Sequence, residues 1–496
     1  MVNIGYAHDG LIGSVQEQLR RAQKEIGFTY LRFHGIFDDD MHIYQENEDG
    51  SPWFNFAYAD LLFDFIQEIG LIPYVELGYM PSKLAKTQYT MFDNPAICIS
   101  MYNDSEKWQA LVQACLSHWI DKYGLANVRK WRFTVFSMNY SRLQYTAPVM
   151  SHEDYCKMFE ATYQTIKMID PELKLGGAGC FPGIALAPDG LRRFLLDVKE
   201  HGCPPDFITV QCYPHEDFSQ DSDFFYFTSK QTSMPSVLSK DRNFTLHFLQ
   251  RLNRIRQEIG FADCPVVVEE WNSTLWQRDL SGDTCYKAAW LIKNVLQNYD
   301  QAEYLGYWLL TDFLDEWLVP GGVFHGGYGL FTINGIPKAG YQALRMLNRI
   351  GERKIASGEG WFVSQSENTI QVYLYHYCHY DALYRYRYQK LTDPHDAYKV
   401  FESDGRLKIE LELCGLDPGI YRQEIWTINR SAGSTFDRWI EMGAPGVMTP
   451  EDLEYLNDMA QPLCKIRDTD TVGTLRLQAE LEPHEVRLIV LKKRDG

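Results

Sequence analysis

The stretch PVVVEEW, residues 265–271, has the pattern of a short buried β-strand that ends in two glutamates and a tryptophan. An amphipathic helical pattern at 241–259 precedes it, and another helical pattern at 283–299 follows it. A further strand pattern at 304–310 comes after that second helix. This order of strand, helix and strand predicts a parallel sheet whose strands are joined by helical crossovers.

The same alternation extends back to the start of the chain. Strand patterns occur at 2–5, 29–34, 71–77, 131–136, 175–178, 207–212, 265–270 and 304–310. Helical patterns occur at 11–26, 56–69, 106–123, 152–169, 190–201, 241–259, 283–299 and 337–351. Eight such units predict a TIM (β/α)8 barrel over residues 1–350. An open doubly wound sheet is the alternative, but no GxGxxG or GxxxxGK[ST] motif follows an early strand.

The pattern changes after residue 350. Strand-like runs between turn residues occur at 362–363, 369–377, 407–413, 419–428, 475–481 and 486–491. They predict a small β-sandwich accessory domain over residues 351–496. The stretch Ser431–Pro462 contains three prolines and is expected to be an irregular insertion.

Composition and charge exclude several classes of protein. Hydrophobic residues make up 45% of the chain and charged residues 23%, which excludes global disorder. No run approaches the ~18 apolar residues of a membrane span, so no membrane association is expected. A net charge of −18 argues against nucleic-acid binding by this segment. The 11 scattered cysteines form no CxxC pair, and no secretion signal is visible, so a cytoplasmic location is expected. We also expect that the protein uses neither a metal ion nor a cofactor.

Polar residues gather where the predicted strands end, which is where a TIM barrel builds its active site. The second strand ends in RFHG (32–35) and the sixth in QCYP (211–214). The seventh ends in EEWN (269–272), and acidic residues follow the eighth. The aspartates at 38–40 with His42 fit a charged loop better than a hard-metal site.

Several of these stretches are similar to glycoside hydrolase family 39, best known for β-xylosidases. The similar segments are RFHGIFDDDM (32–41), LIPYVELGYMP (71–81), VRKW (128–131), VEEWNS (268–273), YWLLTDFLDEW with FHGGYGL (307–330), and YHYCHYD (375–381). Such enzymes are retaining hydrolases whose two catalytic carboxyl groups lie ~5–5.5 Å apart. The resemblance implies that Glu270 occupies the position of the nucleophile. Strand alternation predicts that Glu269 points to the opposite face.

The fourth strand departs from the family pattern. Its sequence is FTVFSMN (133–139), so that Met138 stands where the family has its acid/base glutamate. Ser137 replaces an asparagine that binds the sugar 2-hydroxyl, and Gln211 replaces an expected histidine. A thioether cannot donate a proton. No Asp or Glu occurs between Asp121 and Glu153, so a replacement donor would have to come from elsewhere.

Further site residues follow from the resemblance. His34 is expected to line the sugar pocket, and Tyr213 to lie beside Glu270 and hold its orientation. Trp271 and Trp308 are either platforms for a sugar face or plugs of the barrel mouth. The remaining substrate-binding candidates after the eighth strand are Asp315, Glu316 and His325.

Two functional interpretations remain open. In the first, the chain binds a pentose-containing saccharide as a sensor or a very weak hydrolase, and resembles family-39-like modules fused behind AraC-type helix-turn-helix regulators. A DNA-binding domain would then lie in a fused or missing upstream part. In the second, the chain is an active retaining β-xylosidase whose proton donor has moved to another residue. A purely structural scaffold with a filled barrel mouth is a third alternative. Family relatives also lead us to expect a homo-oligomer.

Overall fold

The computed structural model describes residues 1–88, 90, 97–136, 150–187, 189–216, 237–314, 322–386, 391–402 and 405–494. The chain forms two compact units that interleave along the sequence. The first comprises Met1–Val237, Asn243–Leu275 and Tyr299–Leu318. The second comprises Leu238–Arg242, Trp276–Asn298 and Val319–Gly496. The domain boundary that the sequence predicts at residue 350 remains a prediction.

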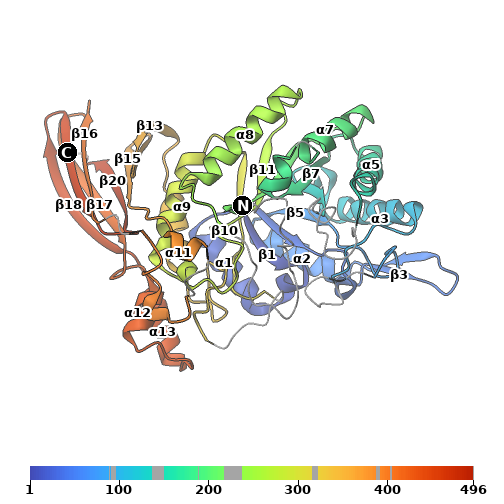
Figure 1. Cartoon of the computed structure of the whole chain (residues 1–496), viewed down its shortest axis with the longest axis horizontal. Helices are drawn as coiled ribbons and strands as arrows, with labels where there is room; N and C mark the ends of the chain where they lie inside the picture. The colour runs from blue at the N-terminus through green and yellow to red at the C-terminus, as the bar shows by residue number, and fades with distance from the viewer. Residues whose placement is uncertain are drawn as a thin grey trace. The chain divides into compact units, whose positions relative to one another are not determined.

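The first unit contains a closed parallel barrel, which confirms the predicted TIM fold (Figure 1). Its strands are β1 (Val2–Tyr6), β2 (Tyr30–His34), β5 (Ile72–Leu77), β6 (Arg132–Val135), β7 (Lys174–Cys180), β8 (Phe207–Cys212), β11 (Val266–Trp271) and β12 (Tyr304–Tyr307). Neighbours in this order pair in parallel, and β1 pairs with both β2 and β12 to close the barrel.

Helices follow the barrel strands along the chain. In the first unit they are α1 (Gly13–Glu25), α2 (Ala57–Glu68), α3 (Ser105–Tyr123), α4 (Leu125–Val128), α5 (His152–Ile169), α6 (Pro182–Ala185), α7 (Leu191–Glu200) and α8 (Phe244–Glu258). Two further helices, α9 (Cys285–Asn298) and α10 (Ala339–Leu347), belong to the second unit. Short strands are β3 (Tyr44–Glu46), β4 (Pro52–Phe54), β9 (His215–Glu216) and β10 (Val237–Leu238). Among the described residues, no helix combines the length and the apolar character needed to cross a membrane.

The barrel interior is apolar at one end and polar at the other. Tyr30, Tyr74, Phe207 and Val267 form a buried cluster, and all lie in the first half of their strands. Charged and polar residues occupy the later positions of the same strands, where Arg32, Glu76, Gln211, Glu269 and Glu270 are buried. The fold therefore places its polar cluster at the carboxyl ends of the strands, as expected for the active site of a TIM barrel.

The second unit contains the predicted sandwich. A six-stranded antiparallel sheet has the order β13 (Arg353–Gly358), β14 (Trp361–Ser366), β15 (Thr369–Tyr375), β20 (Val486–Lys493), β17 (Gly419–Ile428) and β18 (Leu463–Thr471). A two-stranded sheet pairs β16 (Leu407–Cys414) with β19 (Thr474–Leu481). Val372 and Leu491 of the larger sheet share one buried cluster with Ile409 and Leu477 of the smaller sheet. The two sheets therefore pack on a common core.

The expectation of an irregular segment at 431–462 was wrong. This segment contains helix α12 (Thr435–Glu441) and helix α13 (Pro450–Asp458), and a short helix α11 (Ala382–Arg385) lies upstream. The Ser434 hydroxyl accepts a hydrogen bond from the backbone N–H of Asp437, and Thr449 forms a capping box with Asp452. Pro450 lies in the first turn of α13, where a missing N–H costs nothing, so this proline starts the helix rather than preventing it.

Candidate active site

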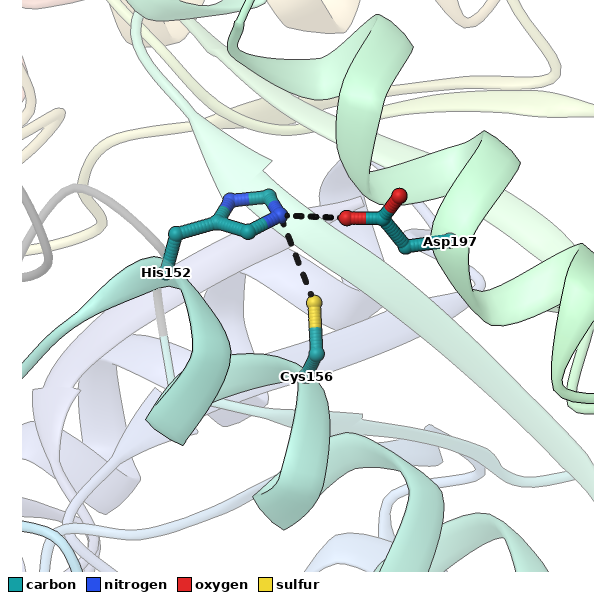
Figure 2. Close-up of side chains that lie close together, drawn as sticks. All are labelled: His152, Cys156 and Asp197. Atoms are coloured by element: carbon teal, nitrogen blue, oxygen red, sulfur yellow. Dashed lines mark hydrogen bonds and ion pairs between the residues drawn. The ribbon is translucent and has the colours of Figure 1, made fainter.

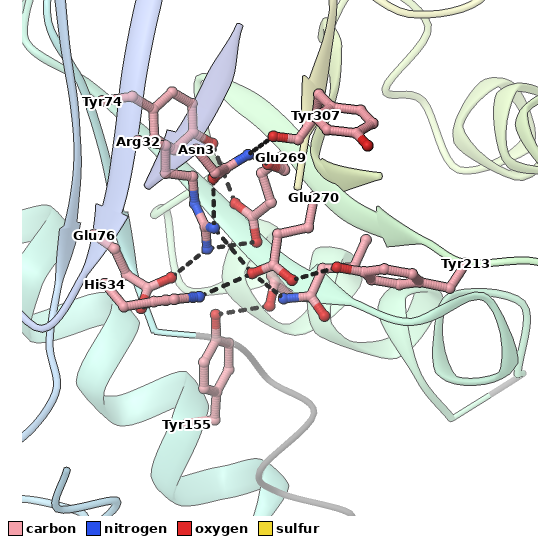
Figure 3. A network of polar contacts seen from close by, with 12 residues as sticks. Asn3, Arg32, His34, Tyr74, Glu76, Tyr155, Tyr213, Glu269, Glu270 and Tyr307 are labelled. Carbon is pink, nitrogen blue, oxygen red and sulfur yellow. Dashed lines mark hydrogen bonds and ion pairs between the residues drawn. The ribbon is translucent and has the colours of Figure 1, made fainter. Parts of the chain in front are cut away.

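Glu270 lies near the end of β11 with its carboxylate surrounded by hydrogen-bond donors (Figure 3). Oε1 accepts from Nη1 of Arg32 at 2.9 Å and from Nε2 of Gln211 at 3.0 Å. The same oxygen lies 3.1 Å from Nε2 of His34, and Oε2 accepts from the hydroxyl of Tyr213 at 3.2 Å. The side chain is 8% exposed, so it is largely shielded from solvent.

These donors decide the charge of Glu270. Burial by itself would raise the pKa of the carboxyl group, since a charge is costly to place in a low-dielectric interior. The guanidinium of Arg32 and the imidazole of His34 outweigh that effect and lower the pKa of Glu270 to about 2. Glu270 is therefore a carboxylate at every pH at which the protein is expected to work.

Arg32 joins three carboxyl groups from its buried position in β2. Its Nη2 lies 2.5 Å from Oε2 of Glu76 and 3.7 Å from Oε1 of Glu269, while Nη1 binds Glu270. Asn3 of β1 accepts from Nη1 at 3.1 Å and donates to the backbone carbonyls of Glu269 and Tyr307. The arginine is thus fixed by strands β1, β5 and β11, and it holds the Glu270 carboxylate in turn.

His34 bridges two of these carboxylates. Its Nδ1 lies 2.7 Å from Oε1 of Glu76, and its Nε2 faces Glu270. Burial lowers the pKa of the imidazole, but Glu76 and Glu270 more than compensate and raise it to about 10. The ring stacks on Tyr79 with an interplanar angle of 17° and packs against Trp308 with a centroid distance of 5.1 Å. His34 therefore acts as a second fixed cation beside Glu270.

Glu269 does not lie on the opposite face from Glu270, so the prediction from strict alternation was wrong. The register between β11 and β8 shifts between Val268 and Glu270, and this irregularity brings both carboxyl groups to Arg32. The hydroxyl of Tyr74 donates to Oε2 of Glu269 at 3.2 Å. Burial, opposed by Arg32 and assisted by Glu76 and Glu270, raises the pKa of Glu269 to about 7.

The predicted contact between Tyr213 and Glu270 is present, and Gln211 joins it. Both residues come from β8 and the turn after it, and both are buried. The Gln211 amide supplies a neutral donor where the family resemblance led us to expect a histidine. The Glu270 carboxylate therefore has four polar partners, of which Gln211 is one.

The two tryptophans have different surroundings. The indole N–H of Trp271 lies 3.5 Å from Oγ1 of Thr245 on helix α8, so this ring packs between the barrel wall and a helix. That position fits the structural alternative for Trp271 better than a sugar platform. Trp308 instead packs beside His34, within reach of the carboxylate cluster. Of these two tryptophans, Trp308 is the one whose ring packs on a residue of the carboxylate cluster.

The contacts predicted for the other sequence-derived residues stay predictions. Ser137, Met138, Asp315 and Glu316 lie outside the described residues. His325 belongs to the second compact unit, whereas the carboxylate cluster belongs to the first. Their proposed contacts with a substrate therefore rest on the sequence.

The sequence analysis did not select four residues that build the site: Asn3, Arg32, Tyr74 and Glu76. A signal for two of them was present. Arg32 and Glu76 interrupt otherwise apolar strands, and a charged residue inside a buried strand needs a partner. Two opposite charges in neighbouring strands therefore could have been predicted to pair.

An ionised carboxylate at the carboxyl end of a (β/α)8 barrel, held by two cations and two neutral donors, can serve as one of the two carboxyl groups that a retaining glycosidase requires. Comparison with known families agrees with this class. The model of Glycosyl hydrolases family 39 matches residues 4–476, and the chain belongs to that family.

Relatives within the family are named as β-xylosidases. The β-xylosidase of Geobacillus stearothermophilus is 26% identical over 484 residues, covering 96% of this chain and 89% of the relative. That of Caldicellulosiruptor saccharolyticus is 34% identical over 343 residues, covering 68% and 65%. A monomeric β-xylosidase from Caulobacter crescentus superposes with a TM-score of 0.84 at 22% identity, covering 99% of this chain and 95% of that structure, and so shows the shared fold.

A different kind of protein also shares part of the sequence. An uncharacterised HTH-type transcriptional regulator of Staphylococcus aureus is 22% identical over 233 residues. The match covers 46% of this chain and 29% of the regulator.

Proposed function

We propose that this chain binds a xyloside-type, pentose-containing saccharide and acts as a sugar sensor or a very weak hydrolase. The single observation that carries the proposal is that one of the two catalytic positions of the family has a carboxyl group in this chain and the other does not. Glu270 is an ionised, well-held carboxylate, whereas by resemblance to the family Met138 takes the place of the acid/base glutamate. Ser137 and Gln211 depart from the family pattern at the same site, which supports a changed role rather than one isolated substitution.

The missing acid affects one step more than the others. In a retaining hydrolase the nucleophile attacks the anomeric carbon while the acid protonates the departing oxygen. General acid catalysis contributes typically ~10²–10⁴-fold, and more for a poor leaving group. A leaving group that is already a stable anion needs no proton. Glu270 is therefore expected to react with highly activated glycosides and to bind, without cleaving, natural ones.

Substrate contacts are proposed for the side chains around Glu270. His34, Gln211 and Tyr213 present donors to this carboxylate, and Trp308 lies beside His34. By resemblance we add Asp315, Glu316 and His325, with Ser137 toward the sugar 2-hydroxyl. Trp271 is proposed to support the site from behind, since its indole lies against helix α8.

The test is a series of aryl β-xylosides whose phenols range from strongly to weakly acidic, each measured with and without azide. Turnover of the most activated members alone, increased by azide, is expected, because azide attacks the glycosyl-enzyme without a general base. The Glu270→Ala variant should lose this turnover. Similar rates across the whole series would refute the loss of the acid.

An active β-xylosidase with a relocated proton donor is the second candidate. The donor set around Glu270 favours it, since binding a sugar does not by itself require a nucleophile held by four groups. Asp315 and Glu316 are the candidate donors. If the series gives comparable rates, replacing each of these with its amide should restore the dependence on leaving group for the true donor.

The regulator interpretation is supported by the partial likeness to an HTH-type transcriptional regulator. In that setting the barrel would supply the sugar-binding part, a separate DNA-binding part would act on the nucleic acid, and the protein would work in the cytoplasm. Self-association of this chain is part of the same proposal, and sedimentation with and without saccharide tests it.

A further inference from the structure

Three potential metal ligands of different chemistry converge on the outside of the barrel strands. His152 and Cys156 lie one turn apart on α5, and Asp197 lies on α7 (Figure 2). Nε2 of His152 lies 2.9 Å from Oδ2 of Asp197 and 3.5 Å from Sγ of Cys156. One ligand atom from each residue lies within 4.8 Å of the other two. None of these residues belongs to the Glu270 network.

The direction of the contacts argues against a nucleophilic triad. In a Cys–His–Asp triad the thiol and the carboxylate use different ring nitrogens, because one nitrogen accepts a proton while the other donates. Here the thiol and the carboxylate both face Nε2 of His152 (Figure 2). One nitrogen cannot satisfy both partners well in either role. All three atoms point instead toward one common place.

We propose that His152, Cys156 and Asp197 form a mononuclear Zn²⁺ site that ties helix α5 to helix α7. A thiolate, an imidazole and a carboxylate are all accepted zinc ligands, and their mixture suits zinc better than calcium or magnesium. Zinc would lie ~2.0–2.3 Å from each ligand atom and take a water molecule as its fourth ligand. The ligand separations require shifts of only about one ångström to reach that geometry.

The carboxylates around the site favour a cation, and the exposure of two of its residues gives the ion access. Cys156 is buried, whereas His152 and Asp197 are partly exposed, so a metal ion has a route of entry. The carboxylates of Asp197 and Glu160 place negative charge near the Cys156 sulfur. Arg193 opposes these carboxylates, since its Nε lies 3.5 Å from Oδ2 of Asp197. Its side chain is half-exposed and free to swing toward solvent when a metal binds.

Binding has a defined proton balance. Zinc coordinates the thiolate of Cys156, so the S–H proton leaves to solvent as the metal–sulfur bond forms. Nε2 of His152 carries the ring proton in its hydrogen bond to Asp197. As Nε2 becomes a ligand, that proton leaves it and solvent supplies one to Nδ1, so the ring stays neutral. No electron is transferred, because Zn²⁺ has no redox chemistry.

The experiment uses the whole chain after removal of metals with a chelator. Titration with Co²⁺ as a spectroscopic probe should give one equivalent per chain, with a sulfur-to-cobalt charge-transfer band and the intense d–d bands of a tetrahedral site. Zn²⁺ should displace the cobalt. Cys156→Ser should remove the charge-transfer band. Asp197→Asn should weaken binding by more than the ~10–100-fold that loss of an outer-shell partner costs.

Two matched controls separate this site from adventitious binding. His118 pairs with Asp60 at 2.7 Å but has Lys122 beside it instead of a thiol, so His118→Ala should change nothing. Cys414 is an exposed cysteine, and Cys414→Ser should also leave the spectrum intact. Far-ultraviolet circular dichroism confirms that each variant is folded. The proposal is overturned if no stoichiometric site appears, if the sulfur band survives in Cys156→Ser, or if it disappears in Cys414→Ser.

Discussion

Arg32 and His34 bring two positive charges into the barrel, opposite the carboxyl groups of Glu76, Glu269 and Glu270. Burying unpaired charge is expensive, so the cluster is most stable when the charges balance. The cluster reaches that balance when Glu269 carries a proton, in agreement with its raised pKa of about 7. Glu270 then remains a carboxylate within an assembly that is neutral as a whole.

Restoring an acid at position 138 tests the proposed function at the level of one side chain. We expect Met138→Glu to increase cleavage of xylosides with poor leaving groups by ~10²–10⁴-fold, the usual contribution of a general acid. Xylosides with strongly acidic phenols should change little, because their departure needs no proton. Steady-state rates on both substrates measure the effect.

Met138→Gln is the matched control, since an amide has a similar size and cannot supply the proton. Equal gains for both variants would show that the methionine blocked space rather than vacated an acid. No gain for either variant would favour a donor that lies elsewhere.

The raised pKa of Glu269 predicts how the free energy of unfolding depends on pH. Its pKa rises from 4.5 to about 7 on folding, so the folded state holds a proton that the unfolded state releases between those values. This contribution is fully present below about 4.5 and is lost as pH rises through 7. Glu269→Gln cannot lose a proton, so it should flatten the pH dependence and be more stable than wild type at pH 8, by on the order of a few kcal/mol.

Thermal unfolding midpoints at pH 5, 6, 7 and 8 measure this difference. Glu258→Gln is the control, because Glu258 forms an exposed pair with Arg192 and should not alter the slope. A Glu269→Gln protein that keeps the wild-type slope would show that another group titrates in this range.

At the scale of elements, the sequence predicts the barrel well because buried strands and amphipathic helices differ in period. The two sandwich strands that it missed, β13 and β18, are the edges of the larger sheet. All six residues of β13 are exposed, and most of β18 is exposed too. An edge strand without a buried face shows no alternation, so its sequence does not distinguish it from a loop.

Some residues of the candidate site could likewise be predicted from the sequence, and others could not. Glu270, Tyr213 and His34 could be predicted, because a family motif surrounds them in the sequence. Asn3 and Tyr74 could not, since their roles depend on which strands become neighbours in the closed barrel. The convergence of Glu269 with Glu270 was missed for another reason. A register shift cannot be seen in a strand that is read alone.

The cap of α13 gives a prediction at this scale. Thr449→Ala removes the hydroxyl that accepts from the backbone N–H of Asp452, and should cost about 1 kcal/mol of local stability. Amide hydrogen exchange in the first turn of α13 should then accelerate about fivefold. Thr449→Ser keeps the hydroxyl and is the control. Equal exchange in the two variants would show that Pro450 and the following acidic residues suffice to start the helix.

At the scale of the whole molecule, the barrel and the sandwich contain different features. The polar cluster lies entirely in the first compact unit, and the sandwich has a separate hydrophobic core. A saccharide that binds at Glu270 should therefore stabilise the barrel strands directly. The sandwich strands β16 and β19 contribute no residue to this cluster.

Saccharide binding should appear as a gain in stability even if no bond is cleaved. A ligand that binds only the folded state stabilises it by RT ln(1 + [L]/Kd), which is ~2.7 kcal/mol at a hundredfold excess over Kd. Xylo-oligosaccharide should therefore raise the unfolding midpoint in a saturable way, whereas mannitol at the same osmolality should not. Hydrogen exchange should slow in β2, β8 and β11 more than in β16 and β19. A sensor predicts this shift in wild type and its loss in Glu270→Ala, because the carboxylate faces the sugar in either interpretation. An unchanged midpoint at saturating concentrations of every pentose saccharide tried would leave the barrel without its proposed ligand, and would favour the scaffold alternative.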